Sequence, residues 1–167
     1  MRMGIGYDIH RFQEGRPLVL GGLELPGETG LAGHSDSDVL LHAIIDSLLG
    51  AAGLGDIGQH FPPDDPQWKD ASSLDLLAET LALVRKAGFD VENIDATVVA
   101  ERPRLVPHIP VMRQRIAEAV GIAAGRVNVK ATTHEGLGPI GRGEGIAAMA
   151  VATLREQAQT AEIDTRA

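Results

Sequence analysis

Stretches with the two-residue period of a β-strand alternate along this chain with stretches of helical period, and that alternation most restricts its fold. A strand is predicted over 91–101 and a helix over about 36–52, where apolar residues recur every three or four positions. Further strands are predicted at 3–10 and 127–133, a hairpin at 18–25, and further helices at 72–88 and 107–121. This order favours an α/β or α+β sheet with helices packed on one face.

Three segments depart from this alternation. The alanines of 145–155 favour a helix, whereas the glycine-rich turn before them favours a strand. The segment 53–70 contains three prolines and several acidic residues, so it is predicted to be an ordered or hinged surface loop. Residues 158–167 have little apolar periodicity and are predicted to be a frayed tail, which leaves 1–157 as a single domain.

The composition limits the chemistry and the partners. The chain has no cysteine, so a transition metal would have to be held by histidines and carboxylates. A formal net charge of −8 argues against nonspecific binding to nucleic acid, although a metal and a few local donors can still neutralise a small phosphorylated ligand. No stretch approaches the roughly 20 apolar residues of a membrane span, and no targeting pattern is visible, so a cytoplasmic protein is expected.

A candidate metal site involves two early segments. Asp8 and His10 are two residues apart on a predicted strand and therefore project from the same side, and His42 lies on the first predicted helix. One carboxylate and two imidazoles are the ligands of a zinc-type site that keeps a coordination position free for chemistry. The alternative is that all three are ordinary surface or hydrogen-bonded polar residues. Asp46, one turn after His42, either orients that imidazole or is a solvated helix position.

The run from His34 to Asp38 also has two interpretations. Ser35, Asp36 and Asp38 are placed to cap the following helix and to complement its dipole. Alternatively, the unpaired amides of the helix start bind phosphate oxygens, and His34 donates a hydrogen bond to a phosphoryl group.

Two later segments combine polar side chains with turns. Thr132, Thr133 and Glu135 either mark a polar exit from a strand or hold phosphates and a hard cation such as magnesium. Arg142, within a glycine-rich turn, is either part of a flexible loop or pairs with a phosphate or with Glu144.

Several short motifs occur in a fixed order over residues 1 to about 155. They are Gly6-Tyr7-Asp8-Ile9-His10, His34-Ser35-Asp36-Ser37-Asp38, Leu54-Gly55-Asp56-Ile57-Gly58, Pro107-His108-Ile109-Pro110, Asn128-Val129-Lys130-Ala131-Thr132-Thr133 and Gly141-Arg142-Gly143-Glu144-Gly145-Ile146. In this order they closely resemble the 2-C-methyl-D-erythritol 2,4-cyclodiphosphate synthase family of the non-mevalonate isoprenoid pathway. The resemblance favours the metal interpretation of the early trio and a strand at 145–155.

The resemblance implies an α+β fold (an α/β sandwich) with a mixed four-stranded sheet, helices on one face and a small hairpin, assembled as a homotrimer with active sites between protomers. It implies Zn2+, or another divalent transition metal, at Asp8, His10 and His42, and Mg2+ or Mn2+ at Glu135 with the substrate phosphates. It assigns transition-state stabilisation to His34 and Thr133. The implied substrate contacts are Asp8, Ile9, His10, His34, Ser35, Asp56, Ile57, Gly58, Phe61, Pro62, Pro63, Asp64, Asp65, Ala100, Glu101, Arg102, Pro103, Arg104, Leu105, Val106, Ala131, Thr132, Thr133, His134, Glu135, Pro139 and Arg142. Of these, residues 56–58 and 61–65 are implied to hold the methylerythritol part, and residues 100–106 and 131–133 to form the cytidine pocket.

The implied substrate is 4-diphosphocytidyl-2-C-methyl-D-erythritol 2-phosphate, whose 2-phosphate attacks its own β-phosphorus, closes a cyclic diphosphate and releases CMP. A zinc-dependent phosphohydrolase that cleaves a nucleotide diphosphate with water is the main alternative. A non-catalytic trimer that binds isoprenoid diphosphates is a second one, but it leaves the metal trio unexplained.

Four residues depart from the family pattern. Arg104 stands where lysine is common and keeps a cation near the nucleotide phosphates, and His134 replaces a frequent threonine. Pro63 removes a polar side chain from the 61–65 loop. Pro139 replaces a frequent aromatic residue, which weakens the expectation of an isoprenoid diphosphate in a central cavity.

Overall fold

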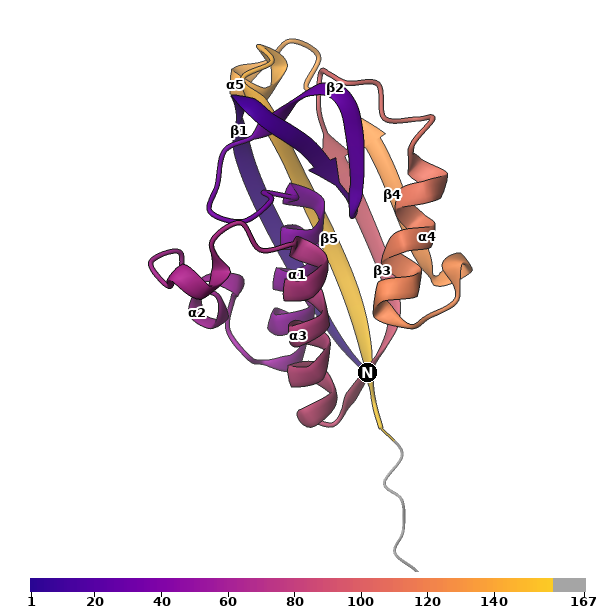
Figure 1. The fold of residues 1–167 in the computed structure, drawn as a ribbon. Helices are drawn as coiled ribbons and strands as arrows, with labels where there is room; N and C mark the ends of the chain where they lie inside the picture. The colour runs from indigo at the N-terminus through magenta and orange to yellow at the C-terminus, as the bar shows by residue number, and fades with distance from the viewer. Residues whose placement is uncertain (158–167) are drawn as a thin grey trace, which may run out of the picture.

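The computed structural model describes residues 1–157, and its framework is one mixed sheet of five strands in the order β2-β1-β5-β3-β4 (Figure 1). The strands are β1 (Arg2–Leu20), β2 (Leu23–Leu31), β3 (Phe89–Val99), β4 (Val127–Thr132) and β5 (Gly145–Glu156). Within residues 1–157, only β3 and β4 are parallel, and every other neighbouring pair is antiparallel. The predicted tail, 158–167, lies outside the described residues.

The predicted mixed four-stranded sheet with a small hairpin is confirmed in part: β1, β5, β3 and β4 form such a sheet, and β2 of the hairpin extends it as a fifth strand. The first strand does not end near residue 10 but continues through Leu20 and turns at Gly21-Gly22 into β2, which pairs with it. Register shifts around Pro17 interrupt the regular pairing of β1 with β2 but do not end it, so the hairpin is an outer part of the same sheet.

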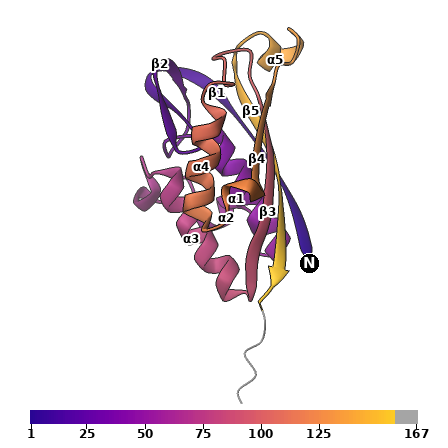
Figure 2. The ribbon, with the colours of Figure 1, turned by 90° about the vertical axis from the view of Figure 1, so that its right-hand side faces the viewer.

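Three long helices cover one face of the sheet, as predicted (Figure 2). They are α1 (Val39–Ala52), α3 (Ser73–Lys86) and α4 (Ile109–Val120). Short helices interrupt the connections, namely α2 (Ile57–His60), α5 (Gly138–Gly141) and the 3₁₀ turns Pro66–Trp68 and Ala124–Arg126. The segment predicted as a loop therefore contains helical turns. Within residues 1–157, no helix is long and apolar enough to cross a membrane.

Helix α1 begins later than predicted because only one of its three expected caps acts on it. Asp38 is the N-cap, and its Oδ1 accepts a hydrogen bond from the Leu41 amide at 3.1 Å. Its Oδ2 accepts from the Gly22 amide at 2.7 Å, which ties the helix start to the β1–β2 turn. Ser35 and Asp36 bond elsewhere, and their contacts belong to the site described below.

Two glycines let α1 lie directly on β1. A Cβ added to Gly6 would be 1.9 Å from the Ala43 carbonyl oxygen, and one added to Gly4 would be 2.1 Å from that of Ser47. No side chain fits at either position, so the helix backbone rests against the strand backbone. This close approach sets the distance between the ligands that the two elements carry.

The ambiguous segment 145–155 is a strand, and its alanines have a packing role. Ala148, Ala150 and Ala152 are buried, and α1 packs against this strand. Small side chains here leave room for the helix, so the alanine content that favoured a helix in isolation serves tertiary packing instead.

The opposite face of the sheet carries exposed apolar side chains. Along β1, Met3, Ile5, Tyr7 and Ile9 are 73%, 72%, 55% and 46% exposed. Met149 and Val151, on the neighbouring β5, add to them, and they pair with Tyr7 and Ile5. We call these six residues the bare apolar face. Such a contiguous patch marks an interaction surface.

Candidate metal centre and adjoining hollows

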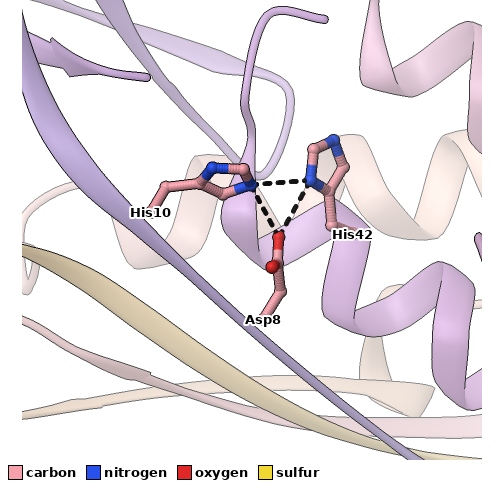
Figure 3. Close-up of side chains that lie close together, drawn as sticks. All are labelled: Asp8, His10 and His42. Carbon is pink, nitrogen blue, oxygen red and sulfur yellow. Dashed lines mark hydrogen bonds and ion pairs between the residues drawn. The ribbon is translucent and has the colours of Figure 1, made fainter. Parts of the chain in front are cut away.

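Asp8, His10 and His42 converge as predicted, the first two from β1 and the third from the first turn of α1 (Figure 3). Asp8 Oδ2 lies 2.8 Å from His10 Nε2 and 2.9 Å from His42 Nδ1. The two ring nitrogens are 3.2 Å apart. Asp8 and His10 sit together because residues two apart on a strand share a face, and this face looks toward α1.

The outer nitrogens of both rings have partners. His10 Nδ1 lies 2.6 Å from the carbonyl oxygen of Ala32, which can only accept, so Nδ1 carries the hydrogen and Nε2 presents its lone pair inward. His42 Nε2 lies 3.0 Å from Ser73 Oγ and 3.2 Å from Ser35 Oγ. When Nε2–H donates to these hydroxyls, the lone pair of Nδ1 also points at the centre.

The charges of the trio are coupled. Burial alone would raise the pKa of Asp8, but when the inward nitrogens of His10 and His42 carry protons they donate hydrogen bonds to its carboxylate, and together with the ring charges these bonds hold that pKa well below its ordinary value. Burial lowers the pKa of His10, but the bond and charge of Asp8 outweigh it, so the net direction is upward. Each direction reflects a carboxylate that favours a positive charge between itself and the rings.

The donor set fits a divalent cation. Two imidazole nitrogens and a carboxylate oxygen lie within 4.8 Å of one another, close enough to bind a single ion. Three protein ligands leave a coordination position free, which is the arrangement of a catalytic rather than a structural site. A metal-binding role for these residues agrees with the prediction.

Asp46 does not hydrogen-bond His42, so the first of its two interpretations is wrong. Its Oδ1 instead accepts a hydrogen bond from the Ile57 amide at 2.8 Å. Asp46 therefore fixes the start of α2 relative to α1. The outer nitrogen of His42 is held by serines from two other segments, which lie 7 and 31 residues away in the sequence.

A hollow of about 230 Å³ opens beside the trio. It is lined by Asp8, His10, His34, Ser35, His42, Ile57, Gly58, Phe61, Pro63, Trp68 and Leu76. Most of these were predicted as metal or substrate contacts, whereas Trp68 and Leu76 were not. Phe61 and Trp68 pack edge to face with ring centroids 4.9 Å apart, which gives the hollow an aromatic wall.

Other residues predicted for the methylerythritol part shape the loop around this hollow. Asp56 is the N-cap of α2 and accepts from the Gln59 amide at 3.0 Å. Asp65 caps the following 3₁₀ turn, and its carbonyl oxygen lies 3.4 Å from His34 Nε2. Pro62 and Asp64 belong to the same loop without lining the hollow.

A second hollow, of about 340 Å³, is formed by the residues predicted to bind cytidine. Its lining is Ala100, Glu101, Pro103, Arg104, Leu105, Val106, Ala131, Thr132 and Thr133. Arg102 does not line it, because its guanidinium stacks over the ring of Phe12 at 4.8 Å. The structure thus brings residues 100–106 and 131–133 together where β3 and β4 end side by side.

The loop after β4 is organised by carboxylates. Thr133 Oγ1 donates to Glu135 Oε1 at 3.0 Å, and Glu101 Oε1 accepts from the amide of His134 at 2.9 Å. Glu135 has a positive φ of 52°, which is uncommon for a residue with a side chain. Arg142 pairs with Glu144 at 2.7 Å, so the predicted pairing within the glycine-rich turn is present.

Ile9 and Pro139 lie apart from both hollows. They line a smaller hollow of about 110 Å³ next to Ile140 and Gly145. Ile9 projects from the opposite side of β1 to Asp8 and His10, so it is not in the metal site.

The Asp8–His10–His42 trio and the second hollow are separated by two strands. Asp8 pairs with Ala148, Ala148 with Val98, and Val98 with Ala131, which puts both sites on one row across the sheet. Three inter-strand spacings correspond to roughly 14 Å. The two hollows share no lining residue.

Together the fold and the site define a class of α+β proteins with a candidate metal site between the first strand and the first long helix. The chain belongs to the YgbB family, whose family model matches residues 1–155. It is 61% identical over 156 residues to the 2-C-methyl-D-erythritol 2,4-cyclodiphosphate synthase of Gloeobacter violaceus, an alignment that covers 93% of this chain and 96% of that protein. The family resemblance seen in the sequence motifs is confirmed.

Solved structures agree with this assignment. A 2C-methyl-D-erythritol-2,4-cyclodiphosphate synthase in its CDP-bound form superimposes with a TM-score of 0.85 at 37% identity, covering 92% of this chain and 100% of that one. The CDP complex of IspF from Plasmodium falciparum superimposes with a TM-score of 0.81 at 33% identity, covering 94% and 97%. Both similarities extend over nearly the whole described chain.

Proposed function

We propose that this protein converts 4-diphosphocytidyl-2-C-methyl-D-erythritol 2-phosphate to 2-C-methyl-D-erythritol 2,4-cyclodiphosphate and CMP. The convergence of Asp8, His10 and His42 at the edge of a hollow carries the proposal, because an open metal centre is suited to phosphate chemistry. The names of the relatives and the CDP bound to one of them support the substrate class. As a cyclising enzyme that releases CMP, it would be a phosphorus–oxygen lyase, working in the cytoplasm, which a cysteine-free sequence suits.

The residues of the site act by positioning. Intramolecular phosphoryl transfer needs alignment and charge neutralisation rather than a protein nucleophile. His34 and Ser35 line the hollow beside the trio and are placed to hold phosphate oxygens. The aromatic wall of Phe61 and Trp68 excludes water from the methylerythritol part and folds the substrate back on itself, which raises the effective concentration of the attacking phosphate. Thr133 would hold the phosphates from the nucleotide side.

Two cations complete the proposal. Zinc bound by Asp8, His10 and His42 would supply Lewis-acid polarisation of a phosphate. Magnesium would be held by Glu135 together with substrate phosphates, which suits an ion that takes one or two carboxylates and keeps other positions for phosphate and water. Glu135 already bonds the Thr133 hydroxyl, so the carboxylate and the phosphate-binding hydroxyl are held as one unit.

A homotrimer with shared active sites is part of the proposal. The bare apolar face needs a partner, and a second copy of the chain supplies one. Within one chain the second hollow, which we propose as the nucleotide site, is separate from the trio. This separation supports an active site assembled from neighbouring protomers. Binding of an isoprenoid diphosphate in a central cavity stays a prediction that Pro139 makes weaker.

The nature of the product tests this function. Purified protein with zinc and magnesium should release CMP from the cytidylylated substrate and yield a cyclic diphosphate, identified by its phosphorus NMR spectrum. A chelator should abolish both products, and adding back zinc and magnesium should restore them. CMP with a linear product would identify a phosphohydrolase instead, and an absence of CMP under these conditions would refute both enzymes.

A further inference from the structure

Behind the metal centre, a buried serine and an aspartate form a chain of hydrogen bonds that ends on the outer nitrogen of His42. Ser73, the first residue of α3, is fully buried, and its Oγ lies 3.0 Å from His42 Nε2. The same hydroxyl donates a short hydrogen bond to Asp36 Oδ1. Ser73 does not line the hollow beside the trio, so it reaches the metal centre only through His42.

Counting donors and acceptors fixes the direction of this chain. A serine hydroxyl has one hydrogen, and Ser73 gives it to the carboxylate of Asp36. Toward His42 the Ser73 oxygen can therefore only accept, which places the imidazole hydrogen on Nε2. A neutral ring with its hydrogen on Nε2 has its lone pair on Nδ1, the atom that faces Asp8 and His10.

Asp36 is itself held in place by three further contacts. Its Oδ2 accepts from the Ser73 amide at 2.9 Å, and its Oδ1 accepts from the Asp38 amide at 3.2 Å. Its own amide donates to the carbonyl of Ala71 at 3.0 Å. The carboxylate thus links the segment before α1 to the start of α3, and it cannot turn away from the serine hydroxyl without losing these bonds.

Ser35 plays a different part. Its Oγ lies 3.2 Å from His42 Nε2 and accepts from the Ser37 amide at 3.1 Å, but nothing fixes where its own hydrogen points. Ser35 also lines the hollow, so its hydroxyl is available to a ligand. Of the two serines, only Ser73 dictates the state of the imidazole.

We infer that Ser73 and Asp36 are positioning residues that set the tautomer and orientation of His42 for metal binding. This inference rests on the proposed function, because it concerns the same metal centre. It predicts that the relay contributes to zinc affinity even in the absence of any substrate. Outer partners of metal-ligating histidines typically contribute 10- to 100-fold in metal affinity.

Zinc affinity of the metal-free protein, measured by competition with a chromophoric chelator, tests the inference. Ser73→Ala should raise the zinc dissociation constant about 10- to 100-fold, because Nε2 loses the acceptor that fixes its hydrogen. Ser47→Ala is the matched control, since Ser47 is equally buried but donates only to the Ile44 carbonyl within α1. The control should bind zinc within about twofold of the wild type, and circular dichroism establishes that each variant is folded.

A double-mutant cycle separates a relay from a merely structural role. Asp36→Ala removes the acceptor of the Ser73 hydrogen, which can then point at His42, so it should weaken zinc binding in the wild-type background but add little to Ser73→Ala. The absorption bands of the cobalt-substituted protein should shift in both single variants and stay unchanged in Ser47→Ala.

The outcomes are distinct. Unchanged zinc affinity in folded Ser73→Ala, or additive effects of the two substitutions, would overturn the relay and leave the proposed function standing. If Ser73→Ala does not fold, Asp36→Ala alone decides, and unaltered affinity and cobalt bands in it refute the inference. A wild-type chain that binds no zinc would overturn the metal centre and the relay together.

Discussion

At the scale of single residues, the hydrogen bonds of each histidine decide which of its ring nitrogens is free to act as a metal ligand. His10 gives one ring nitrogen to a backbone carbonyl and His42 gives one to buried serines, so the inward nitrogens of both rings are left as ligands. The strand period predicted the Asp8–His10 pair. Nothing local could predict the partners of His42, because Ser73 is 31 residues away and its contact depends on how α3 packs against α1. The carboxylate of Asp46 lies one helical turn from His42 and was a candidate partner for its ring, but it accepts a hydrogen bond from a backbone amide instead.

Removing one ligand should empty the centre. Asp8→Ala takes away the only carboxylate of the trio, so we expect loss of bound zinc and a fall in CMP release of at least about 100-fold, beyond the range of outer-partner effects. Metal analysis and a CMP assay check this. His108→Ala, at the start of α4 and outside the trio, is the control and should keep both. Full activity in metal-depleted Asp8→Ala would contradict the assignment.

Asp38 should make stability depend on pH. Burial raises its pKa to about 6, even though amides of the β1–β2 turn and α1 bond to it. The folded protein then holds the proton more tightly than the unfolded chain, where the pKa is about 3.9. The contribution of this group to the free energy of unfolding therefore falls by roughly 3 kcal/mol as pH rises from about 4 to about 6. Above about pH 6 this contribution no longer changes.

Urea unfolding of metal-free wild type and Asp38→Asn across this range isolates the effect, because the variant cannot titrate at this position. The stability of the wild type relative to the variant should decline between about pH 4 and pH 6. Parallel profiles for the two proteins would show that Asp38 does not carry the raised pKa.

At the scale of elements, predictions succeeded where periodicity was strong and failed where tertiary contacts decided. The helices 72–88 and 107–121 lie within two or three residues of α3 and α4. Strand β1 continues through Gly15 and Pro17, although both residue types favour turns, because register shifts against β2 accommodate them. The alanine-rich strand β5 could not be told from a helix locally, because its small side chains reflect the presence of α1.

The contact between β1 and α1 should be intolerant of a single methyl group. Gly6→Ala places a Cβ against the Ala43 carbonyl and must push the helix away from the strand that carries Asp8. We expect a loss of about 1–3 kcal/mol in the free energy of unfolding, together with weaker zinc binding, because the ligands of the two elements separate. Chemical denaturation and zinc titration measure both.

Gly50→Ala is the matched control for this change. Gly50 lies in α1, the helix that packs on β1, and its added Cβ would meet only the Ile5 carbonyl at 3.9 Å, an ordinary contact. Alanine there should stabilise the helix by up to about 1 kcal/mol and leave zinc affinity unchanged. Equal effects of the two substitutions would show that the close approach at Gly6 has no special role.

At the scale of the whole molecule, the sheet has two unlike faces. One is covered by the three long helices, and the other bears the bare apolar face. The alternation of side chains along β1 therefore serves two purposes, with metal ligands toward α1 and apolar residues away from it. The sequence showed this alternation, but only the sheet order reveals that residues of β5 extend the apolar patch.

A charge in the bare apolar face should prevent assembly. Val151 is 41% exposed and pairs with Ile5, so Val151→Asp is tolerated by the isolated protomer but buries a carboxylate in the proposed trimer. We expect analytical ultracentrifugation to give a trimer for the wild type and a monomer for the variant. The monomer should still bind zinc but lose CMP release.

Val111→Asp provides the comparison, because Val111 is 45% exposed on α4, away from this face. It should remain trimeric and active. A trimeric Val151→Asp, or a monomeric wild type, would refute the assembly proposed here.

The six apolar side chains facing away from the helices have a consequence for working conditions. In the proposed trimer the protomers cover these side chains, so dilution should separate the protomers and expose the side chains to water. Catalytic output per chain should therefore have a threshold in protein concentration, below which the sample still contains folded, zinc-loaded molecules that turn over nothing.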